Sequence, residues 1–307
     1  MKKILITGSS GFIGKMLLHR LGKKNYELLE LESDLVNFED VKSEIETKNP
    51  NIIIHLAAKT EVEKSFYYPT NFSQVNYSGT VNLIECSKSL KDLDNFIFSS
   101  TMETYGFQPI SDEIKKLGYC KEHKPFNEQT EQNPNAPYAI AKLGCEYYLK
   151  YAGRAYNFPY TILRQTNTYG RSDNDFFVVE QIIIQMLKSN VCKLGYKTPY
   201  RNFIYIDDLL DLYEVVINNT KQSSKKIFCI GPDNALRIDE LADMIKNKLN
   251  WNGEIIWDTK PARPGEIYYL NSTNEYVTKT LGWKPKTDLN TGLDKTINAL
   301  KQRENLI

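Results

Sequence analysis

The sequence predicts an α/β protein in which helices cover a parallel sheet and a smaller lobe follows. Short apolar runs bounded by turn residues alternate with longer amphipathic segments, which is typical of parallel strands joined by helices. A glycine-rich turn at residues 7–14 directly follows the first apolar run. After about residue 165 the alternation becomes less regular, which indicates that the second lobe begins there.

The first part of the chain alternates between expected strands and helices. Strands are expected where short apolar runs occur, at residues 3–7, 27–31, 52–56, 95–99 and 160–164. Helices are expected at residues 12–21, 38–47, 72–87 and 138–156, and the second is followed by the breaker Asn49-Pro50. Right-handed crossovers would place the ends of these strands along one crevice.

The second lobe is expected to be a small α/β unit. It would contain strands at 226–230 and 254–257 and a helix at 238–249. Residues 203–217 resemble a strand that enters a helix, and this segment could return to the first lobe. We therefore expect one domain at 1–165, joined by about residues 200–220, and a second at 166–307.

Composition excludes several classes of partner. Lysine and arginine total 39 and aspartate and glutamate 38, so no overall field attracts nucleic acid or a membrane surface. Five scattered cysteines show neither zinc-site spacing nor a disulfide framework, so we expect reduced thiols and no metal. The first strand leaves no room for a signal peptide, and no apolar stretch approaches the roughly 20 residues of a membrane helix. A cytoplasmic protein is the expectation.

The glycines Gly8, Gly11 and Gly14 predict a dinucleotide site. Glycine lets a backbone approach a pyrophosphate closely, and N–H groups at the start of the next helix, near Phe12 and Ile13, favour negative charge. A tight turn packed on a sheet is the alternative. A P-loop is excluded because Ser9 replaces its first glycine and Met16 replaces its magnesium-binding hydroxyl residue.

Glu32 indicates the type of dinucleotide. It follows Gly8 by 24 residues, near the end of the second expected strand, where an acidic side chain can accept hydrogen bonds from adenosine ribose. Its carboxylate would repel the 2′-phosphate of NADP, so NAD is favoured. The alternative is a solvated glutamate at a strand end.

Tyr138 and Lys142 lie four residues apart and therefore on one helix face. Near a positive nicotinamide, the ammonium group would stabilise a phenolate and lower the tyrosine pKa. Tyr138 could then remove a proton from a sugar hydroxyl as hydride leaves.

Several motifs occur in the order seen in one enzyme family. In the first half these are the glycine triplet, Asp34-Leu35, Leu56-Ala57-Ala58, Asn76, Ser99-Ser100-Thr101 with Tyr105-Gly106, and Tyr138 with Lys142. In the second half they are residues 164–170, 201–207, 263–266 and 281–285. Together they resemble the extended short-chain dehydrogenases/reductases, in the branch of nucleotide-sugar epimerases and dehydratases. The resemblance runs through essentially the whole chain.

The resemblance implies a Rossmann-type, doubly wound lobe that binds NAD, and a smaller carboxy-terminal lobe that binds a nucleotide diphosphate sugar. Thr101 would hydrogen-bond the C4 oxygen of the hexose, Tyr138 would be the base and Lys142 would tune it. Asn167, Arg201 and Arg263 would lie at the sugar diphosphate. The implied cofactor contacts are Gly8, Gly11, Phe12, Ile13, Gly14, Glu32, Asp34, Leu35, Leu56, Ala57, Ala58, Asn76, Ser99, Tyr138 and Lys142. A homodimer through the helices at 72–87 and 138–156 is expected by analogy.

The residues after Thr101 bear on the outcome of the reaction. Dehydratases of this branch usually follow the threonine with Asp-Glu, whereas C4-epimerases usually carry small or neutral residues. This chain has Met102 and Glu103, so only the second carboxylate is present, and both residues are counted with Thr101, Tyr138 and Lys142 as candidate catalytic positions. Glu103 favours a dehydratase because a carboxylate can remove the C5 proton of a 4-keto sugar. A C4-epimerase and a non-catalytic dinucleotide-binding protein remain as alternatives, and Glu103 could instead face solvent while Met102 fills a gap.

The segment 107–130 is expected to be a long loop over the sugar site. Cys120 and His123 lie in it, and either could contact substrate, but a lid or surface position without a chemical role is favoured. His19 and His55 are interpreted as structural.

Overall fold

A six-stranded parallel sheet forms the centre of the larger part of the molecule. The computed structural model describes residues 1–120, 123–232, 234–261 and 263–306. The strand order is β10-β5-β4-β3-β1-β2, and every neighbouring pair is parallel. The strands are β1 Lys2–Thr7, β2 Tyr26–Glu30, β3 Ile52–His55, β4 Asn95–Thr101, β5 Tyr160–Gln165 and β10 Lys226–Ile230. The expected Rossmann-type α/β fold is confirmed.

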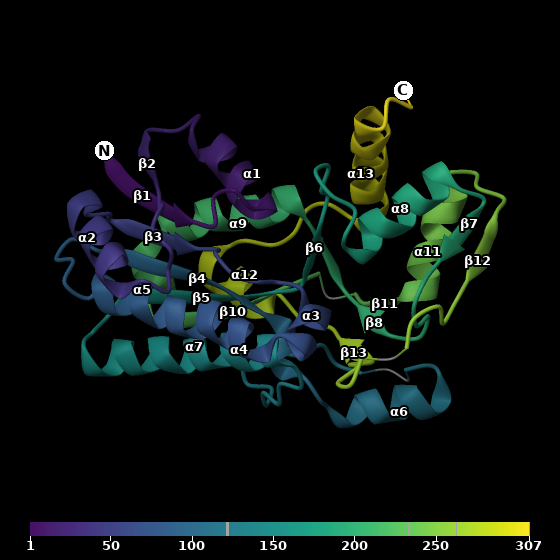
Figure 1. Ribbon diagram of the computed structural model, residues 1–307, viewed down its shortest axis with the longest axis horizontal. Coiled ribbons are helices and arrows are strands. Elements are labelled where there is room, and N and C mark those ends of the chain that lie inside the picture. The colour runs from purple at the N-terminus through teal and green to yellow at the C-terminus, as the bar shows by residue number, and fades with distance from the viewer. Residues whose placement is uncertain (121–122, 233, 262, 307) are drawn as a thin grey trace.

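Helices cover both faces of this sheet (Figure 1). One face is covered by α1 Phe12–Leu21 and α9 Ile206–Asn218, and the other by α2 Phe38–Lys48, α5 Gly79–Ser87 and α7 Pro137–Ala155. The alternation along β1 shows the two cores: Ile4 and Ile6 join the cluster with α1 and α9, whereas Leu5 joins the cluster with α2, α5 and α7. Strands buried on both faces explain why the sequence shows continuous apolar runs.

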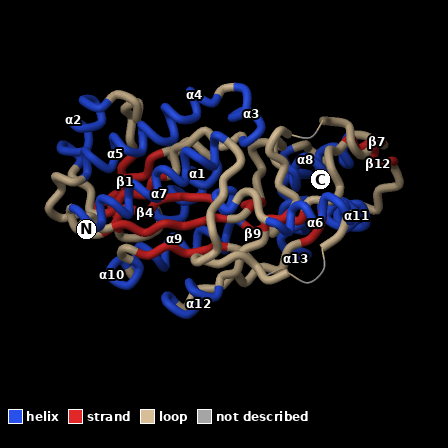
Figure 2. Tube along the Cα trace, turned by 90° about the horizontal axis from the view of Figure 1, so that it is seen from below, coloured by secondary structure: helices blue, strands red, loops and turns tan. Residues whose placement is uncertain are grey.

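The smaller lobe lies at one end of the molecule, to the right in Figures 1 and 2. Its core contains residues of α8 Val178–Lys188, α11 Ile238–Lys248 and α13 Leu289–Arg303. The short strands around it pair as β7 Val191–Lys193 with β12 Glu254–Ile256, β6 Asn167–Tyr169 with β9 Phe203–Tyr205, and β8 Tyr200–Arg201 with β11 Leu236–Arg237 and β13 Tyr269–Leu270. The remaining segments are α3 Val62–Tyr67, α4 Pro69–Phe72, the π turn η1 Ser73–Ser78, the 3-10 turn η2 Met102–Tyr105, α6 Pro109–Leu117, α10 Thr220–Ser223 and α12 Glu275–Leu281.

Three segments differ from the expectations. Residues 226–230 were expected in the second lobe, but they form β10, the edge strand beside β5, because α9 returns to the main sheet and packs against α1. The expected helix at 72–87 is divided into α4, the π turn η1 and α5. The segment 107–130 contains helix α6 and is therefore not wholly a loop. Within the described ranges, no helix combines the length and apolar character needed to span a membrane.

Candidate active site

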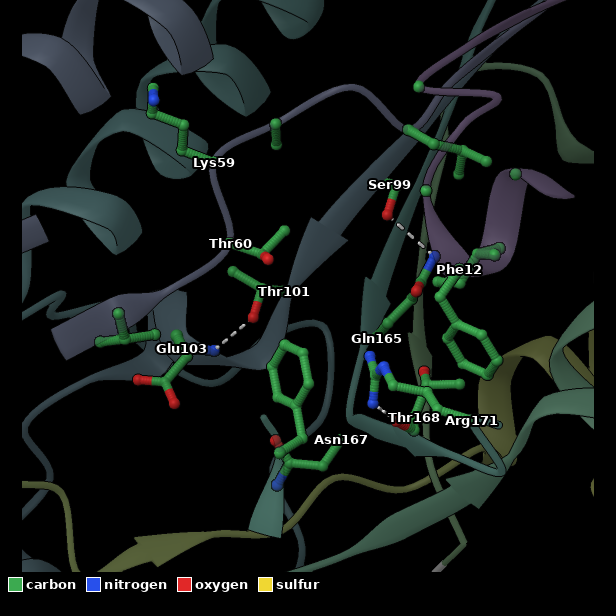
Figure 3. Close-up of a pocket in the computed structure, with 18 of the residues that line it drawn as sticks. Phe12, Lys59, Thr60, Ser99, Thr101, Glu103, Gln165, Asn167, Thr168 and Arg171 are labelled. Carbon is green, nitrogen blue, oxygen red and sulfur yellow. Dashed lines mark hydrogen bonds between the residues drawn. The ribbon is translucent and has the colours of Figure 1, made fainter. Parts of the chain in front are cut away.

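A cavity of about 690 Å³ lies at the carboxyl ends of β1, β3, β4 and β5 and extends to the start of α8. This is the edge at which doubly wound sheets bind their ligands. In the close-up, Thr101 and Glu103 lie on one side and Phe12 and Arg171 on the other (Figure 3). The sequence-predicted site residues that line the cavity are Gly8, Gly11, Phe12, Ile13, Gly14, Leu56, Ala57, Ala58, Ser99, Thr101, Glu103, Tyr138, Lys142 and Asn167.

The glycine turn has no space for side chains. Gly8 has a φ of 69°, and a Cβ there would lie 2.6 Å from the backbone nitrogen of Ala57. A Cβ on Gly14 would lie 2.3 Å from the carbonyl oxygen of Gly8. No side chain caps the start of α1, so its first N–H groups face the cavity free to bind an anion. These features fit the pyrophosphate of a dinucleotide.

Asn76 holds the loop after β3 from behind the cavity. Its side chain accepts a hydrogen bond from the backbone nitrogen of Lys59 at 2.8 Å and donates one to the carbonyl oxygen of Lys59 at 2.9 Å. Asn76 lies in the π turn η1, an irregularity that is frequent at functional sites. It was expected among the cofactor contacts, but it does not line the cavity and instead shapes the loop that does.

His55 is part of a buried hydrogen-bond chain between these elements. The hydroxyl of Thr80 donates to the carbonyl oxygen of Asn76 at 2.6 Å, so it accepts from Nε2–H of His55 at 2.8 Å. Nδ1 of His55 then accepts from the hydroxyl of Thr7 at 2.7 Å. Burial, with a smaller effect of the charge on Lys142, lowers the pKa of His55 to about 3 and keeps it neutral. The structural role interpreted from the sequence agrees with these contacts.

Tyr138 and Lys142 lie together on α7 beside the end of β4. Lys142 is 3% exposed, and its ammonium group donates to the carbonyl oxygen of Ser99 at 2.8 Å and lies 4.7 Å from the ring centre of Phe98. Burial lowers the pKa of Lys142 to about 8. Burial also raises the pKa of Tyr138 well above 10, and the charge of Glu103 raises it further, while a hydrogen bond with Thr101 opposes this. The protein's own groups thus shift Tyr138 in the direction opposite to that expected for a base.

The buried charge of Lys142 is expected to lower the free energy of unfolding near neutral pH. Unfolded lysine retains its proton up to about pH 10.5, whereas folded Lys142 releases it near 8, so the unfolded state binds more protons between these values and stability rises with pH. We expect Lys142→Met to raise the free energy of unfolding at about pH 7 by the order of 1–3 kcal/mol while it abolishes activity. Urea unfolding should show this gain shrinking toward about pH 10. A gain that is equal at both pH values would contradict the assigned cause.

Glu103 and Met102 point in different directions although they are adjacent. Both belong to the tight turn η2, in which the backbone nitrogen of Glu103 donates to the hydroxyl oxygen of Thr101 at 3.2 Å. Glu103 lines the cavity. Met102 is 2% exposed and packs in an apolar cluster with Tyr105, Phe126 and other side chains behind it. Met102 was included among the catalytic positions, but its side chain does not line the cavity.

Arg201 and Arg263, expected at the substrate diphosphate, lie outside the lining of the cavity. Arg263 forms a forked contact with Glu266, from Nε at 2.9 Å and Nη2 at 2.7 Å. Arg201 lies 3.5 Å from the same carboxylate and donates to the carbonyl oxygen of Ile267 at 2.7 Å. Both guanidinium groups are close enough to Glu103 for its charge to act on them.

Three expected cofactor residues near β2 also lie outside the cavity lining. The side chain of Glu32 is 88% exposed, and its nearest cation is Nζ of Lys48 at 3.8 Å. The carboxylate of Asp34 accepts a hydrogen bond from the backbone nitrogen of Val36, and Leu35 is buried against Gly79. The backbone nitrogen of Glu32 is itself bonded to Glu44 at 2.9 Å, so the chain here is directed by α2.

The segment 107–130 contributes nothing to the cavity lining in its described part. The ring of His123 packs against Phe126 and Tyr269, and the backbone nitrogen of Cys120 donates to the hydroxyl of Tyr200 at 3.3 Å. Among the described residues no three His, Cys, Asp or Glu side chains gather as metal ligands.

Several lining residues were not identified from the sequence. They are Ser10, Lys59, Thr60, Val62, Val75, Ser100, Gln165, Thr166, Thr168, Tyr169, Arg171, Asn174, Phe177, Val178, Val179, Glu180 and Phe203. Gln165 could have been found from the sequence, because it is the last residue of β5 as Thr101 is the last residue of β4. Its amide donates to the hydroxyl of Ser99 at 3.1 Å. No local pattern distinguishes the residues from the start of α8.

The fold and the cavity together define a dinucleotide-dependent enzyme with a Tyr–Lys pair. The model of the NAD dependent epimerase/dehydratase family matches residues 4–231. The chain therefore belongs to this family, within the extended short-chain dehydrogenases/reductases. The expectation that the cofactor is NAD is thereby confirmed.

Relatives of both reaction types are similar to this chain. A putative UDP-glucose 4-epimerase of Methanocaldococcus jannaschii is 29% identical over 97% of this chain and 98% of its own. A dTDP-D-glucose 4,6-dehydratase of Dictyostelium discoideum is 30% identical over 80% of this chain and 62% of its own. The crystal structure of a UDP-glucose 4-epimerase from Thermotoga maritima, with UDP-glucose, superposes with a TM-score of 0.86 at 25% identity, over 99% of this chain and 100% of that one.

Proposed function

We propose that this enzyme is a nucleotide-sugar dehydratase that oxidises C4 of a hexose transiently and eliminates water across C5 and C6. The observation that supports this most is the position of Glu103. Its carboxylate lines the same cavity as Thr101, Tyr138 and Lys142, and it is close enough to Tyr138 to raise the pKa of that phenol. An epimerase has no use for a base at this place.

The cofactor would lie along the glycine turn, with its pyrophosphate at Gly8, Gly11 and the start of α1, and its nicotinamide near Ser99 and Tyr138. The loop at Leu56–Ala58 would cover its other side. Held there, NAD would supply a positively charged ring that accepts the C4 hydride and would make the same hydride available to the sugar later in the turnover. The contacts of Glu32, Asp34 and Leu35 with the adenosine end remain a proposal from the resemblance.

Tyr138 and Thr101 would act first, at the C4 hydroxyl. The Thr101 hydroxyl bonds the C4 oxygen and orients it, and the phenolate of Tyr138 takes the hydroxyl proton as the C4–H bond breaks. Lys142, which remains positively charged below about pH 8, stabilises the phenolate. Burial alone raises the Tyr138 pKa, so the base forms only where positive charge offsets that cost.

Glu103 would act second, on the keto sugar. The ketone at C4 acidifies the C5 proton, which Glu103 removes as the bond from C6 to its hydroxyl breaks. Since Met102 is a thioether and packs away from the cavity, it donates no proton to the leaving group. The proton that Glu103 has gained would pass, directly or through a water, to the departing hydroxyl, which leaves as the one water released. When the hydride returns to the sugar, the proton that Tyr138 took up would supply the matching proton.

The substrate would be a nucleotide diphosphate hexose held toward the second lobe. Similar proteins are named for UDP-glucose and dTDP-D-glucose, and Asn167 lines the cavity at the start of that lobe. Arg201 and Arg263 are close enough to Glu103 for its charge to act on them but are engaged by Glu266, so we propose that they meet the diphosphate only by exchanging this partner.

A C4-epimerase is the second candidate. It is favoured by the names of the Methanocaldococcus jannaschii relative and the Thermotoga maritima structure. It would use Thr101, Tyr138 and Lys142 in the same oxidation and would not need Glu103. A non-catalytic dinucleotide-binding role is less well supported, because these three residues lie together in one cavity.

Incubation with UDP-, dTDP-, GDP- and CDP-hexoses tests the proposal. We expect one of these sugars to lose the mass of one water, with no net change in NADH. NMR of the product then separates a 4-keto-6-deoxy sugar from a 5,6-alkene. Unchanged mass with altered stereochemistry at C4 would replace the dehydratase with the epimerase.

We also propose that the enzyme is a homodimer through α7 and the helices before α5. An apolar stripe of Ile140, Tyr147 and Tyr151 is exposed along α7, and Tyr77 is exposed beside Gly144. Burying such a stripe against a second copy is favourable. We expect the double variant Ile140→Arg with Tyr147→Arg to be monomeric by size-exclusion chromatography with light scattering, and Phe38→Arg, on exposed α2, to leave the dimer intact. A monomeric wild type would overturn this proposal.

A cytoplasmic location is proposed for the same protein. Four cysteines, Cys86, Cys145, Cys192 and Cys229, are buried free thiols. Free thiols of this kind are typical of proteins in reducing compartments.

A further inference from the structure

Two polar side chains at the end of the cavity form a unit that is not explained by the proposed reaction. Arg171 follows β6 and lies between two aromatic rings, 4.5 Å from the ring centre of Phe12 and 3.8 Å from that of Phe177. Phe12 is the first residue of α1, and Phe177 directly precedes α8. The guanidinium group therefore contacts the starts of the helix on the cofactor side and the helix of the second lobe. Figure 3 shows Arg171 beside Phe12.

Arg171 has more donors than the protein uses. Its side chain is 10% exposed, and Nη1 donates to the carbonyl oxygen of Thr168 at 2.7 Å. The nearest carboxylate oxygen, on Glu180, is 3.9 Å from Nη1, which is too far for a hydrogen bond. The other N–H groups of the fork have no acceptor among the described residues. At this distance Glu180 forms an ion pair that offsets part of the charge of Arg171 but leaves these donors without an acceptor, which a phosphate oxygen would supply.

Glu180, in turn, has an acceptor oxygen that the protein does not use. It is fully buried on α8, and Oε1 accepts hydrogen bonds from the backbone nitrogens of Gly170 at 2.9 Å and Arg171 at 3.0 Å. Its Oε2 has no hydrogen-bond partner in the described part of the chain, and the residue lines the cavity. The accessible surface of Oε2 is below 1 Å², so a ligand hydroxyl reaches this oxygen only if the side chain turns toward the cavity, and the missing hydrogen bond is the free energy that this contact would recover.

We propose that Arg171 and Glu180 form a sugar-phosphate subsite, in which Arg171 binds a phosphate oxygen and Oε2 of Glu180 accepts a hydroxyl of the adjoining sugar. A guanidinium fork is well suited to phosphate, and a carboxylate accepts a short, strong hydrogen bond from a hydroxyl. No side chain caps α1 or α8, so the starts of both helices add favourable potential for the phosphate.

Two proposed ligands of the enzyme contain a phosphate next to a ribose hydroxyl. They are the dinucleotide and a nucleotide sugar. The stacking of Arg171 on Phe12, in the glycine turn, favours the dinucleotide. The alternative is a purely structural pair in which Glu180 fixes the turn at Gly170 and Arg171 fills space between the rings. The two explanations differ in what happens to ligand affinity when the fold is intact.

Calorimetric titration of the full chain with ADP-ribose, UDP and inorganic pyrophosphate separates these explanations without relying on turnover. We expect Arg171→Gln to weaken ADP-ribose about ten- to hundredfold, and Arg171→Lys, which keeps the charge and loses the fork, to weaken it less. Glu180→Gln retains an acceptor for the two backbone N–H groups. It should weaken ADP-ribose several-fold but leave pyrophosphate, which has no ribose hydroxyl, unchanged.

Arg154→Gln, on the exposed face of α7, is the matched control and should bind all three ligands like the wild type. Weakened UDP with unchanged ADP-ribose would assign the same subsite to the nucleotide sugar. Unchanged affinity for both ligands in Arg171→Lys and Glu180→Gln, at wild-type melting temperature, would overturn the proposal. Failure of the dehydratase assignment leaves this result intact, because the test measures binding alone.

Discussion

Tyr138→Phe is expected to lower kcat by about 10³-fold with little change in substrate affinity. Positioned acid–base groups contribute about 10²–10⁴-fold, and Tyr138 is the group that takes the C4 hydroxyl proton in both candidate reactions. Phenylalanine keeps the ring in its buried position on α7, so packing is retained. The measurement is steady-state turnover of the sugar identified in the substrate panel.

The control for Tyr138→Phe is the protein without substrate. Its melting temperature and its NAD content should equal those of the wild type, since the hydroxyl contributes little to either. Tyr148→Phe changes a similar hydroxyl that donates to Glu85 at 2.6 Å, away from the cavity, and should retain turnover. If Tyr138→Phe keeps the cellular or in vitro effect of the protein, the non-catalytic alternative becomes the better explanation.

Glu103→Gln is expected to stop the reaction after the first oxidation. The amide cannot remove the C5 proton, so dehydration should fall by about 10²–10⁴-fold while the C4 step continues. Bound NADH should then accumulate when substrate is added, which absorbance at the reduced nicotinamide band detects. Glutamine keeps the backbone hydrogen bond of residue 103 to Thr101, so the turn η2 should be preserved.

Removing the charge at position 103 has a second consequence that can be measured. Glu103 contributes to the raised pKa of Tyr138, after the larger effect of burial, so the variant should lower that pKa. The alkaline rise of the single-turnover oxidation rate should therefore move to lower pH. Glu131→Gln, an exposed residue outside the cavity, is the matched control. Full product formation by Glu103→Gln would remove the dehydratase proposal and favour the epimerase.

The site residues that could be predicted are those whose positions follow from their spacing in the sequence. Gly8, Gly11 and Gly14 identify a strand-to-helix turn, and the four-residue spacing of Tyr138 and Lys142 fixes a common helix face. The positions of Thr101 and Glu103 could be predicted because both residues follow an expected strand. Each of these residues lines the cavity, because the carboxyl ends of parallel strands converge there.

The residues that could not be predicted depend on contacts between distant segments. The direction of Glu32 is set by Glu44 and Lys48 on α2, and no spacing rule describes that contact. Met102 follows Thr101 in the sequence, but the tight turn directs it into an apolar cluster that combines residues 105–126 with residues 229–270. The position of Arg171 depends on Phe12 and Phe177, which are distant from each other in the sequence, as well as on the carbonyl oxygen of Thr168. For the same reason β10 was misplaced, since its position depends on the packing of α9 on α1.

The buried hydrogen-bond chain through His55 determines which groups can appear in a pH profile of this enzyme. Its pKa is about 3, so the imidazole stays neutral across the range in which an ordinary histidine titrates. Protonation would break the bond from Thr7 and disturb the glycine turn and the Asn76 loop together. Acid should therefore unfold the cofactor site cooperatively with the protein rather than titrate it locally, and an activity transition near pH 6 should be sought at a residue other than His55.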